Sequence, residues 1–372
     1  MLFDINMINP VNKKVIVGFS GGVDSAVSML LLKDQGADVE ALHMTNWEDD
    51  GYCDAAKDLQ DAKKVCNQLS IPLHHVNFAK EYKESVFQYF LDEHKLGRTP
   101  NPDIICNREI KFGVFKKYAE RLGAEYIATG HYAKLKENNE VMELTKPRDK
   151  NKDQTYFLHA VKSKNFENTL FPLEDLTKNE VRSIAKENGL FNHKKKDSTG
   201  ICFIGERPFR QFLRNYFPVN PGPIVDLEKN VMGTHEGLMF HTIGQRHGLK
   251  IGGKKYGSGE PWYVVEKKMN ENTLVVVQGN HQNLYCNKII VSNVSWINSS
   301  PFCEIENKDT LKCSVKIRYR QADQTCILKK LNKKNIQIEF DQPQRAVALG
   351  QSAVFYDNDK CLGGGFIEKI IK

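Results

Sequence analysis

The strongest constraint on the fold is a regular alternation of two sequence patterns between Val15 and Gly130. Short β-rich runs alternate with longer segments of helical periodicity; the runs are KVIVGF, ADVEALHMT, PLHHVNF and EYIATG. Because this alternation is typical of parallel strands joined by helices, we expect an α/β fold with helices on both faces of a parallel sheet. Ligands of such sheets bind beyond the carboxyl ends of the strands, so the loops that follow the strands are the candidate sites.

The pattern changes beyond about residue 220, where Gly- and Pro-punctuated β-branched runs predict strands and turns. In the segment LKCSVKIRYR, apolar and polar residues alternate, so we expect Val315 and Ile317 on a core face and Lys316 and Arg318 on a solvated face. A chain of 372 residues is too long for one ordinary core. We expect an α/β domain at 1–205, a middle β-rich domain at 206–280 and a C-terminal β-barrel, or a sandwich, at 281–372.

Composition excludes several classes of protein. No apolar run approaches the roughly 18 residues needed to cross a bilayer, and the first twelve residues lack a signal-peptide pattern. We therefore expect a cytoplasmic protein with no membrane partner. Nine cysteines without any C-x-x-C argue against a disulfide framework and against a zinc site, and we predict no metal-ligating residues. Of the net charge of +7, residues 281–372 contribute 14 − 9 = +5, which weakly favours a polyanionic partner for this part.

The motif VIVGFSGGVDSAV predicts a strand, a glycine-containing loop and a helix. It contains neither a Walker A motif nor G-x-G-x-x-G. Gly21 and Gly22 would let backbone amides approach an anion, Ser20 and Ser25 add hydroxyl donors, and the helix start supplies positive potential. These features favour phosphate binding over the alternative, an ordinary strand-to-helix turn.

The motif TPNPDIICNREIKF places a cysteine at the start of a predicted helix. Two prolines stiffen the loop that presents Asn101 and Asp103. With Asp103 as N-cap, Cys106 would occupy the third helical position, where the helix potential, Arg108 and Lys111 would lower the pKa of the thiol. The local sequence supports equally well a capping aspartate followed by a half-buried structural cysteine.

A second isolated cysteine, Cys202, lies in the run DSTGICFIGE among small and turn-forming residues. These neighbours leave four roles open: a buried apolar residue, a metal ligand, half of a disulfide, or a nucleophile. Other parts of the chain must decide between them.

Both cysteine motifs, together with GFSGGVDSAVS, ATGHYA, KDQTYFL, TIGQRHGL, RYRQ and GQSAVFY, closely resemble the tRNA-specific 2-thiouridylases. The resemblance runs from about Lys13 to Lys372, with small departures at Phe19 and His247. This family belongs to the PP-loop ATP pyrophosphatases, which adenylate a carbonyl oxygen while splitting ATP into AMP and pyrophosphate. The resemblance therefore implies an adenine nucleotide α-hydrolase-like catalytic domain, a β-rich middle domain and a tRNA-binding β-barrel.

The resemblance also implies a reaction, the replacement of the C2 oxygen of the wobble uridine (position 34) of tRNA by sulfur. ATP, with Mg²⁺, would adenylate that oxygen. Cys202 would carry a persulfide received from a sulfur-donor protein, either a relay protein or a cysteine desulfurase. Cys106 would be the partner nucleophile and would close a Cys106–Cys202 disulfide, which a reductant must break before the next turnover.

Further positions follow from the same resemblance. The implied ATP-binding residues are Gly18, Phe19, Ser20, Gly21, Gly22, Val23, Asp24, Ser25, Met44 and Gly130. The target base would contact Asn101, Pro102 and Asp103, with Asp103 as acid–base. The implied tRNA contacts are His131, Lys152, Asp153, Gln154, Arg318, Tyr319 and Gln351. A structural histidine at position 131 and a solvated strand face at position 318 are the alternatives.

Two other functions compete with this interpretation. One is a different PP-loop enzyme that acts on RNA, such as a 4-thiouridine-type synthetase; an amidotransferase would need a glutaminase domain, which no stretch suggests. The other is a catalytically inactive RNA-binding relative. Intact Ser20, Asp24, Cys106 and Cys202 argue against an inactive protein.

Overall fold

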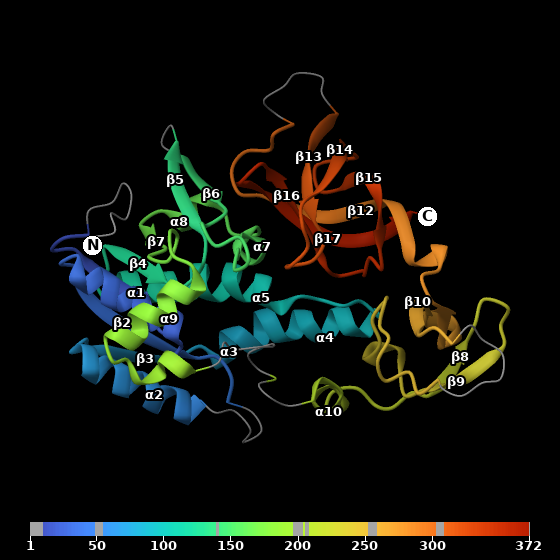
Figure 1. Cartoon of the computed structure of the whole chain (residues 1–372), viewed down its shortest axis with the longest axis horizontal. Helices are drawn as coiled ribbons and strands as arrows, with labels where there is room; N and C mark the ends of the chain where they lie inside the picture. Colours follow the sequence, from blue (N-terminus) through green and yellow to red (C-terminus); the bar gives the residue numbers. More distant parts are fainter. Residues whose placement is uncertain are drawn as a thin grey trace.

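The computed structural model describes residues 10–48, 55–138, 141–195, 204, 208–251, 259–302 and 309–371. Figure 1 shows three parts: an α/β region drawn in blue and green, a small β-region in yellow, and a β-barrel in orange and red. Cys202 lies outside the described residues. No helix in the described ranges combines the length and the apolar content that crossing a bilayer requires.

A five-stranded parallel sheet forms the first region, in the order β3-β2-β1-β4-β7. Its strands are β1 (Lys14–Gly18), β2 (Asp38–Thr45), β3 (Leu73–Asn77), β4 (Tyr126–Thr129) and β7 (Thr169–Leu170). Val15 and Val17 pack with apolar residues of α1 (Val23–Asp34), α2 (Ala55–Leu69) and α9 (Lys178–Glu187). Ile16 faces the opposite core, formed by helices of residues 79–121. The predicted parallel sheet with helices on both faces is confirmed.

The helices of residues 79–121 contain π-helical segments that the sequence did not predict. The first helical run comprises α3 (Ala79–Tyr82), the π-helix η1 (Lys83–Phe87) and α4 (Gln88–Lys95). The second comprises α5 (Pro102–Ile105), the π-helix η2 (Cys106–Phe115) and α6 (Lys116–Arg121). Since the π-helix repeats its hydrogen bonds every five residues, Cys106 and Lys111 lie one repeat apart on η2.

The rest of the α/β region is made of short elements. They are the hairpin β5 (Lys134–Asn138) and β6 (Val141–Thr145), the helices α7 (Thr155–Leu158) and α8 (Ser163–Phe166), and the 3₁₀ turn η3 (Phe191–Lys194). Helix α9 begins with a capping box, in which the Thr177 and Glu180 side chains accept hydrogen bonds from each other's backbone amides.

The middle region contains a four-stranded sheet in the order β10-β11-β8-β9. The strands are β8 (Gly222–Val225), β9 (Val231–His235), β10 (Trp262–Lys268) and β11 (Thr273–Gln278). Helix α10 (Phe209–Arg214) precedes them, with Pro208 as its N-cap. Short 3₁₀ turns complete the region and its link to the barrel; they are η4 (Leu238–Phe240), η5 (Met269–Glu271) and η6 (Gln282–Leu284).

Six antiparallel strands close into the C-terminal barrel, which confirms the barrel and excludes the sandwich. They are β12 (Tyr285–Trp296), β13 (Thr310–Lys316), β14 (Gln324–Lys330), β15 (Ile336–Arg345), β16 (Ser352–Asp357) and β17 (Lys360–Ile371). The order is β12-β15-β14-β13-β16-β17, and pairing of β12 with β17 closes the ring. The β5–β6 hairpin extends this sheet, because Thr145 pairs with Lys360.

The faces predicted for residues 311–320 are correct for Val315, Ile317 and Arg318 and wrong for Lys316, and the strand is shorter than predicted. Strand β13 ends at Lys316, and Arg318 and Tyr319 lie in the turn that follows. Lys316, expected on a solvated face, is only 7% exposed. Its ammonium is buried because a carboxylate from the α/β region, Asp153, lies against it.

Candidate functional site

The loop between β1 and α1 has the geometry of an anion site. Helix α1 begins at Val23 with Gly22 as an extended N-cap, and no side chain among the described residues caps it. Gly21 has φ +77°, in the left-handed region that favours glycine, and a Cβ there would lie 3.2 Å from the carbonyl oxygen of Asp58. The hydroxyls of Ser20 and Ser25 are 3.4 Å apart. Backbone amides, hydroxyls and the helix start therefore converge on one loop.

Asp24, in the first turn of α1, is held by two groups that the sequence did not point to. Lys178 Nζ lies 2.7 Å and 2.8 Å from the two carboxylate oxygens. The Tyr132 hydroxyl donates to Oδ1 at 2.8 Å. Lys178 is the first residue of α9, so the Thr177 capping box sets where this ammonium lies. A cation thus stands beside the loop, 154 positions away along the chain.

Strand register brings the other predicted nucleotide residues to this loop. Gly18 pairs with Leu42 of β2 and with Thr129 of β4, so Met44 and Gly130 lie just beyond the end of β1 on its two sides. A Cβ on Gly130 would lie 2.8 Å from Ser25 N and 2.9 Å from the carbonyl carbon of Asp24. Glycine is therefore required where β4 meets the start of α1.

The helix that carries Cys106 begins two residues earlier than we expected. Its N-cap is Asn101, whose Oδ1 accepts a hydrogen bond from Asp103 N at 3.1 Å, and Pro102 occupies the first helical position. Asp103 is therefore inside the helix, and Cys106 is the fifth residue after the cap. At that distance the orphan amides of the helix start no longer face the thiol.

The ionisation of Cys106 also differs from the prediction. The thiol is 6% exposed, and burial raises its pKa to about 11. The Lys111 ammonium opposes this increase, and the Asp103 carboxylate adds to it. The expected lowering of the pKa is wrong for the protein without substrates, because desolvation of the thiolate outweighs the nearby cation.

Lys111 acts electrostatically on three of the predicted site residues, Asp103, Cys106 and His131. Its Nζ is 3.5 Å from His131 Nε2, and Thr129 Oγ1 is 2.8 Å from His131 Nδ1. Burial, with Lys111, keeps the pKa of His131 well below its usual value, so the imidazole is neutral. Burial raises the pKa of Asp103, and Lys111 opposes this shift as it does for Cys106. One cation therefore acts on all three groups.

Five of the residues predicted to contact tRNA, Lys152 to Gln154 with Arg318 and Tyr319, fall on two segments that meet at the barrel. In the loop before α7, the Asp153 side chain is buried and Gln154 Oε1 accepts a hydrogen bond from Tyr132 N at 2.9 Å. In the turn after β13, Arg318 donates to the carbonyl oxygens of Arg345 and Ala346, and the Tyr319 ring lies 4.5 Å from the Phe157 ring, centroid to centroid.

Gln351 connects the barrel to the loop that we predicted to contact the target base. Its Nε2 donates to Thr99 O at 2.6 Å, and Thr99 N donates to Leu349 O at 2.8 Å. On the other side, Thr99 Oγ1 is 3.2 Å from Thr242 Oγ1 of the TIGQRHGL motif. Residues of the barrel and of the middle region thus hold the segment that immediately precedes Asn101.

The sheet order and the glycine loop between β1 and α1 define a PP-loop domain of the HUP class. A family model described as "tRNA methyl transferase HUP domain" matches residues 13–206. Models described as "tRNA methyl transferase PRC-barrel domain" and "Aminomethyltransferase beta-barrel domain" match residues 210–278 and 286–367.

Curated relatives match almost the whole chain. The tRNA-specific 2-thiouridylase MnmA of Pseudoalteromonas translucida is 53% identical over 364 residues, 96% of this chain and 98% of its own length. The protein of that name from Vibrio vulnificus is 53% identical over 369 residues, 97% of both chains. The chain therefore belongs to the tRNA-specific 2-thiouridylase family. The U34-tRNA thiolase NcsA of Methanococcus maripaludis aligns over 53% of this chain and 63% of its own with 20% identity and a TM-score of 0.35, which adds nothing to this assignment.

Proposed function

We propose that this protein is an ATP-dependent tRNA sulfurtransferase that replaces the C2 oxygen of the wobble uridine by sulfur. The observation that carries the proposal is the continuity between two chemical sites. Gly130 lies against the start of α1 at the anion loop, and the next residue, His131, lies 3.5 Å from Lys111 on the helix of Cys106. The loop that we assign to phosphate and the helix of Cys106 are thus connected through Gly130 and His131, which supports activation followed by sulfur attack.

Activation makes the uracil oxygen a leaving group. The C2 carbonyl is a poor electrophile, and oxide cannot leave it. In the proposed first step the C2 oxygen attacks the α-phosphorus of ATP, and pyrophosphate departs. We assign the pyrophosphate to the loop of Ser20 to Ser25, where backbone amides face it. The carboxyl group of Asp103, whose pKa is raised, would hold or release the proton of the base.

Mg²⁺ would be bound chiefly through ATP in this scheme. Among the described residues no three His, Cys, Asp or Glu side chains gather as metal ligands. Mg²⁺ commonly keeps its waters and binds phosphate oxygens with only one or two carboxylates, so a nucleotide-borne ion fits this donor set. Its chemistry would be to neutralise charge on the phosphates during adenylation.

Sulfur transfer uses both cysteines. The terminal sulfur of a Cys202 persulfide attacks C2, and AMP leaves with the former C2 oxygen. Cys106 then attacks the Cys202 sulfur, which breaks the S–S bond, leaves sulfur on the base and forms the Cys106–Cys202 disulfide; alternatively Cys106 first releases sulfide, which attacks C2. A dithiol reductant must restore both thiols. The persulfide comes from a donor protein, a relay protein or a cysteine desulfurase.

The remaining assignments are part of the same proposal. The tRNA would lie across the loop of Lys152 to Gln154 and the barrel turn of Arg318 and Tyr319, with its target base drawn into a pocket at Asn101 to Asp103. We keep the domains at 1–205, 206–280 and 281–372, and we expect the reaction in the cytoplasm, where the tRNA substrate is found.

Single substitutions separate the proposed steps. Asp24→Ala should abolish AMP formation and leave tRNA affinity nearly unchanged. Cys202→Ser should still adenylate tRNA but accept no labelled sulfur from a donor system, whereas Cys106→Ser should accept the label and fail to complete thiolation. Label on Cys106 and not on Cys202 would reverse the two roles. In cells lacking the protein, loss of 4-thiouridine alone would instead favour a 4-thiouridine-type synthetase.

A further inference from the structure

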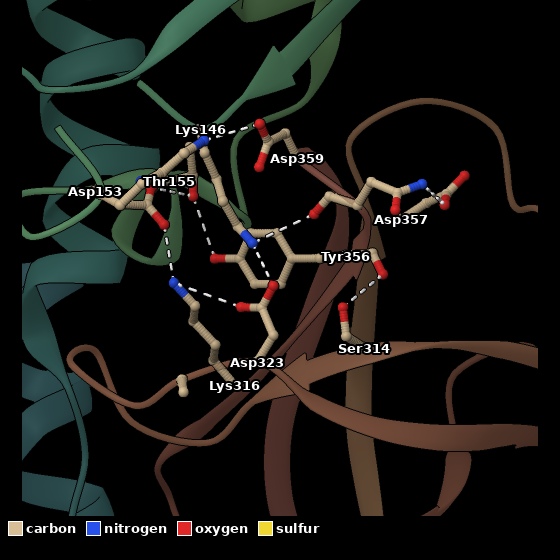
Figure 2. Close-up of polar contacts among 12 residues, drawn as sticks. Lys146, Asp153, Thr155, Ser314, Lys316, Asp323, Tyr356, Asp357 and Asp359 are labelled. Atoms are coloured by element: carbon tan, nitrogen blue, oxygen red, sulfur yellow. Dashed lines mark hydrogen bonds and ion pairs between the residues drawn. The ribbon is translucent and has the colours of Figure 1, made fainter. Parts of the chain in front are cut away.

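A buried network of charges joins the α/β region to the barrel (Figure 2). We define the interdomain ion network by Lys146 and Asp153 of the α/β region and by Lys316, Asp323 and Tyr356 of the barrel. Four of the five, all except Asp323, are buried. Charged side chains are rarely buried unless they are paired, so each buried charge of the network requires a partner of opposite sign.

The central contact of the network is the ion pair of Lys316 with Asp153. Lys316 Nζ lies 2.9 Å from Asp153 Oδ2, and the two side chains are only 9% and 2% exposed. The other oxygen, Oδ1, accepts hydrogen bonds from Thr155 N at 3.0 Å and from Thr155 Oγ1 at 2.6 Å. Both oxygens of Asp153 therefore have partners inside the protein.

The rest of the network completes the pairing. Lys146 contacts the Asp323 carboxylate, whose second oxygen lies 3.7 Å from Lys316 Nζ. Both ammoniums also face the Tyr356 ring, at 4.4 Å for Lys146 and 5.3 Å for Lys316 from its centroid. The charges alternate in sign, and Figure 2 shows them converging on the ring from both regions. Each charge therefore depends on the others to offset its desolvation.

The ion pair links the two segments to which we assign tRNA binding. Asp153 stands between Lys152 and Gln154, and Lys316 is the last residue before the turn that holds Arg318 and Tyr319. The pair spans 163 positions of the chain. A loop and a turn on separate regions cannot present a continuous surface to RNA unless something fixes one against the other.

We propose that the Lys316–Asp153 ion pair is a positioning device, which fixes the loop of residues 152–154 against the barrel turn so that both form one tRNA-binding surface. Neither charged group contacts RNA in this arrangement. This inference rests on the proposed function and changes the role of Asp153, which the family resemblance had placed among the tRNA contacts. Lys316 acts through the segments that it holds, not through a phosphate.

The test compares the double variant Lys316→Met/Asp153→Asn with the single variants and with wild type. The double variant leaves no unpaired buried charge, so it should fold, as its melting temperature would show. We expect tRNA affinity to fall about tenfold in each single variant and no further in the double variant, because all three remove one coupling. The KM for tRNA should rise while kcat and the KM for ATP stay near wild type, and Lys316→Arg should restore affinity.

Salt dependence distinguishes positioning from direct contact. In the Lys316 and Asp153 variants the slope of log affinity against log salt should not change, because no phosphate contact is lost. In the control Arg318→Ala the slope should fall by about one. Additive losses in the double variant, a changed slope in Lys316→Met, or a folded double variant with wild-type affinity would each overturn the proposal. In each of these cases the unmodified protein would still thiolate tRNA. If the proposed function itself were wrong, the unmodified protein would not thiolate tRNA at all.

Discussion

Replacing Lys111 by methionine tests how the Cys106 thiol becomes a nucleophile. Burial holds the pKa of Cys106 at about 11, and Lys111 is the cation that opposes burial. A pH of 8 is three units below this pKa (11 − 8), so in the protein without substrates about one molecule in a thousand carries the Cys106 thiolate. Removing the cation should raise the pKa further and reduce the thiolate fraction by roughly three- to tenfold.

The assay is the rate of carbamidomethylation of Cys106 by iodoacetamide between pH 7 and about 9.5, measured by peptide mass spectrometry. In wild type the rate should rise about tenfold per pH unit with no plateau, because the range lies below the pKa. Lys111→Met should lower the rate at every pH, and Lys111→Arg should stay near wild type. Cys66 is the internal control, because burial alone raises its pKa to about 12. Its rate of carbamidomethylation should not change when Lys111 is replaced.

Two results would refute this reasoning. A rate that levels off below pH 9 in wild type would mean that the thiol ionises more easily than its burial allows. Equal rates in Lys111→Met and Lys111→Arg would mean that the cation does not act on Cys106. Below the pKa a further rise of the pKa also scales the rate equally at every pH, so the pH profile does not distinguish it from steric protection. The charge-conserving Lys111→Arg makes that distinction, because it keeps the cation and adds no space around the thiol.

Two further predictions concern the anion loop. Gly130→Ala should lower ATP affinity measured by calorimetry more than tenfold, because its Cβ would meet backbone atoms of α1 at 2.8 Å and 2.9 Å. Gly233→Ala, whose nearest neighbours are side chains at 3.9 Å, is the control, and equal affinities would contradict the prediction. Thr177→Ala should cost about 1 kcal/mol of unfolding free energy and also slow AMP formation, because the cap sets where Lys178 meets Asp24. If Thr177→Ala is destabilised but forms AMP at the wild-type rate, the cap does not influence the contact of Lys178 with Asp24.

Much of the architecture follows from local patterns in the sequence. Strand-and-helix alternation predicted the parallel sheet, and the glycine loop predicted the junction of β1 with α1. The spacing of Thr177 and Glu180 is a further local signal, because it is that of the capping box that begins α9. Each of these features depends on residues within one or two turns of one another. One local signal was misread: Pro102 favours the first helical position, which indicates Asn101 and not Asp103 as the N-cap.

The tertiary structure decided where charges lie and how readily groups ionise. The alternation of apolar and polar residues predicted that Lys316 is exposed. Lys316 is buried because Asp153 of the α/β region forms an ion pair with it. The pKa of Cys106 depends on how much protein covers the thiol, which no helix position reveals. Lys178 reaches Asp24 because two helices pack on one face of the sheet. Local sequence determines backbone conformation within a few residues, whereas desolvation and ion pairing depend on partners more than a hundred positions away.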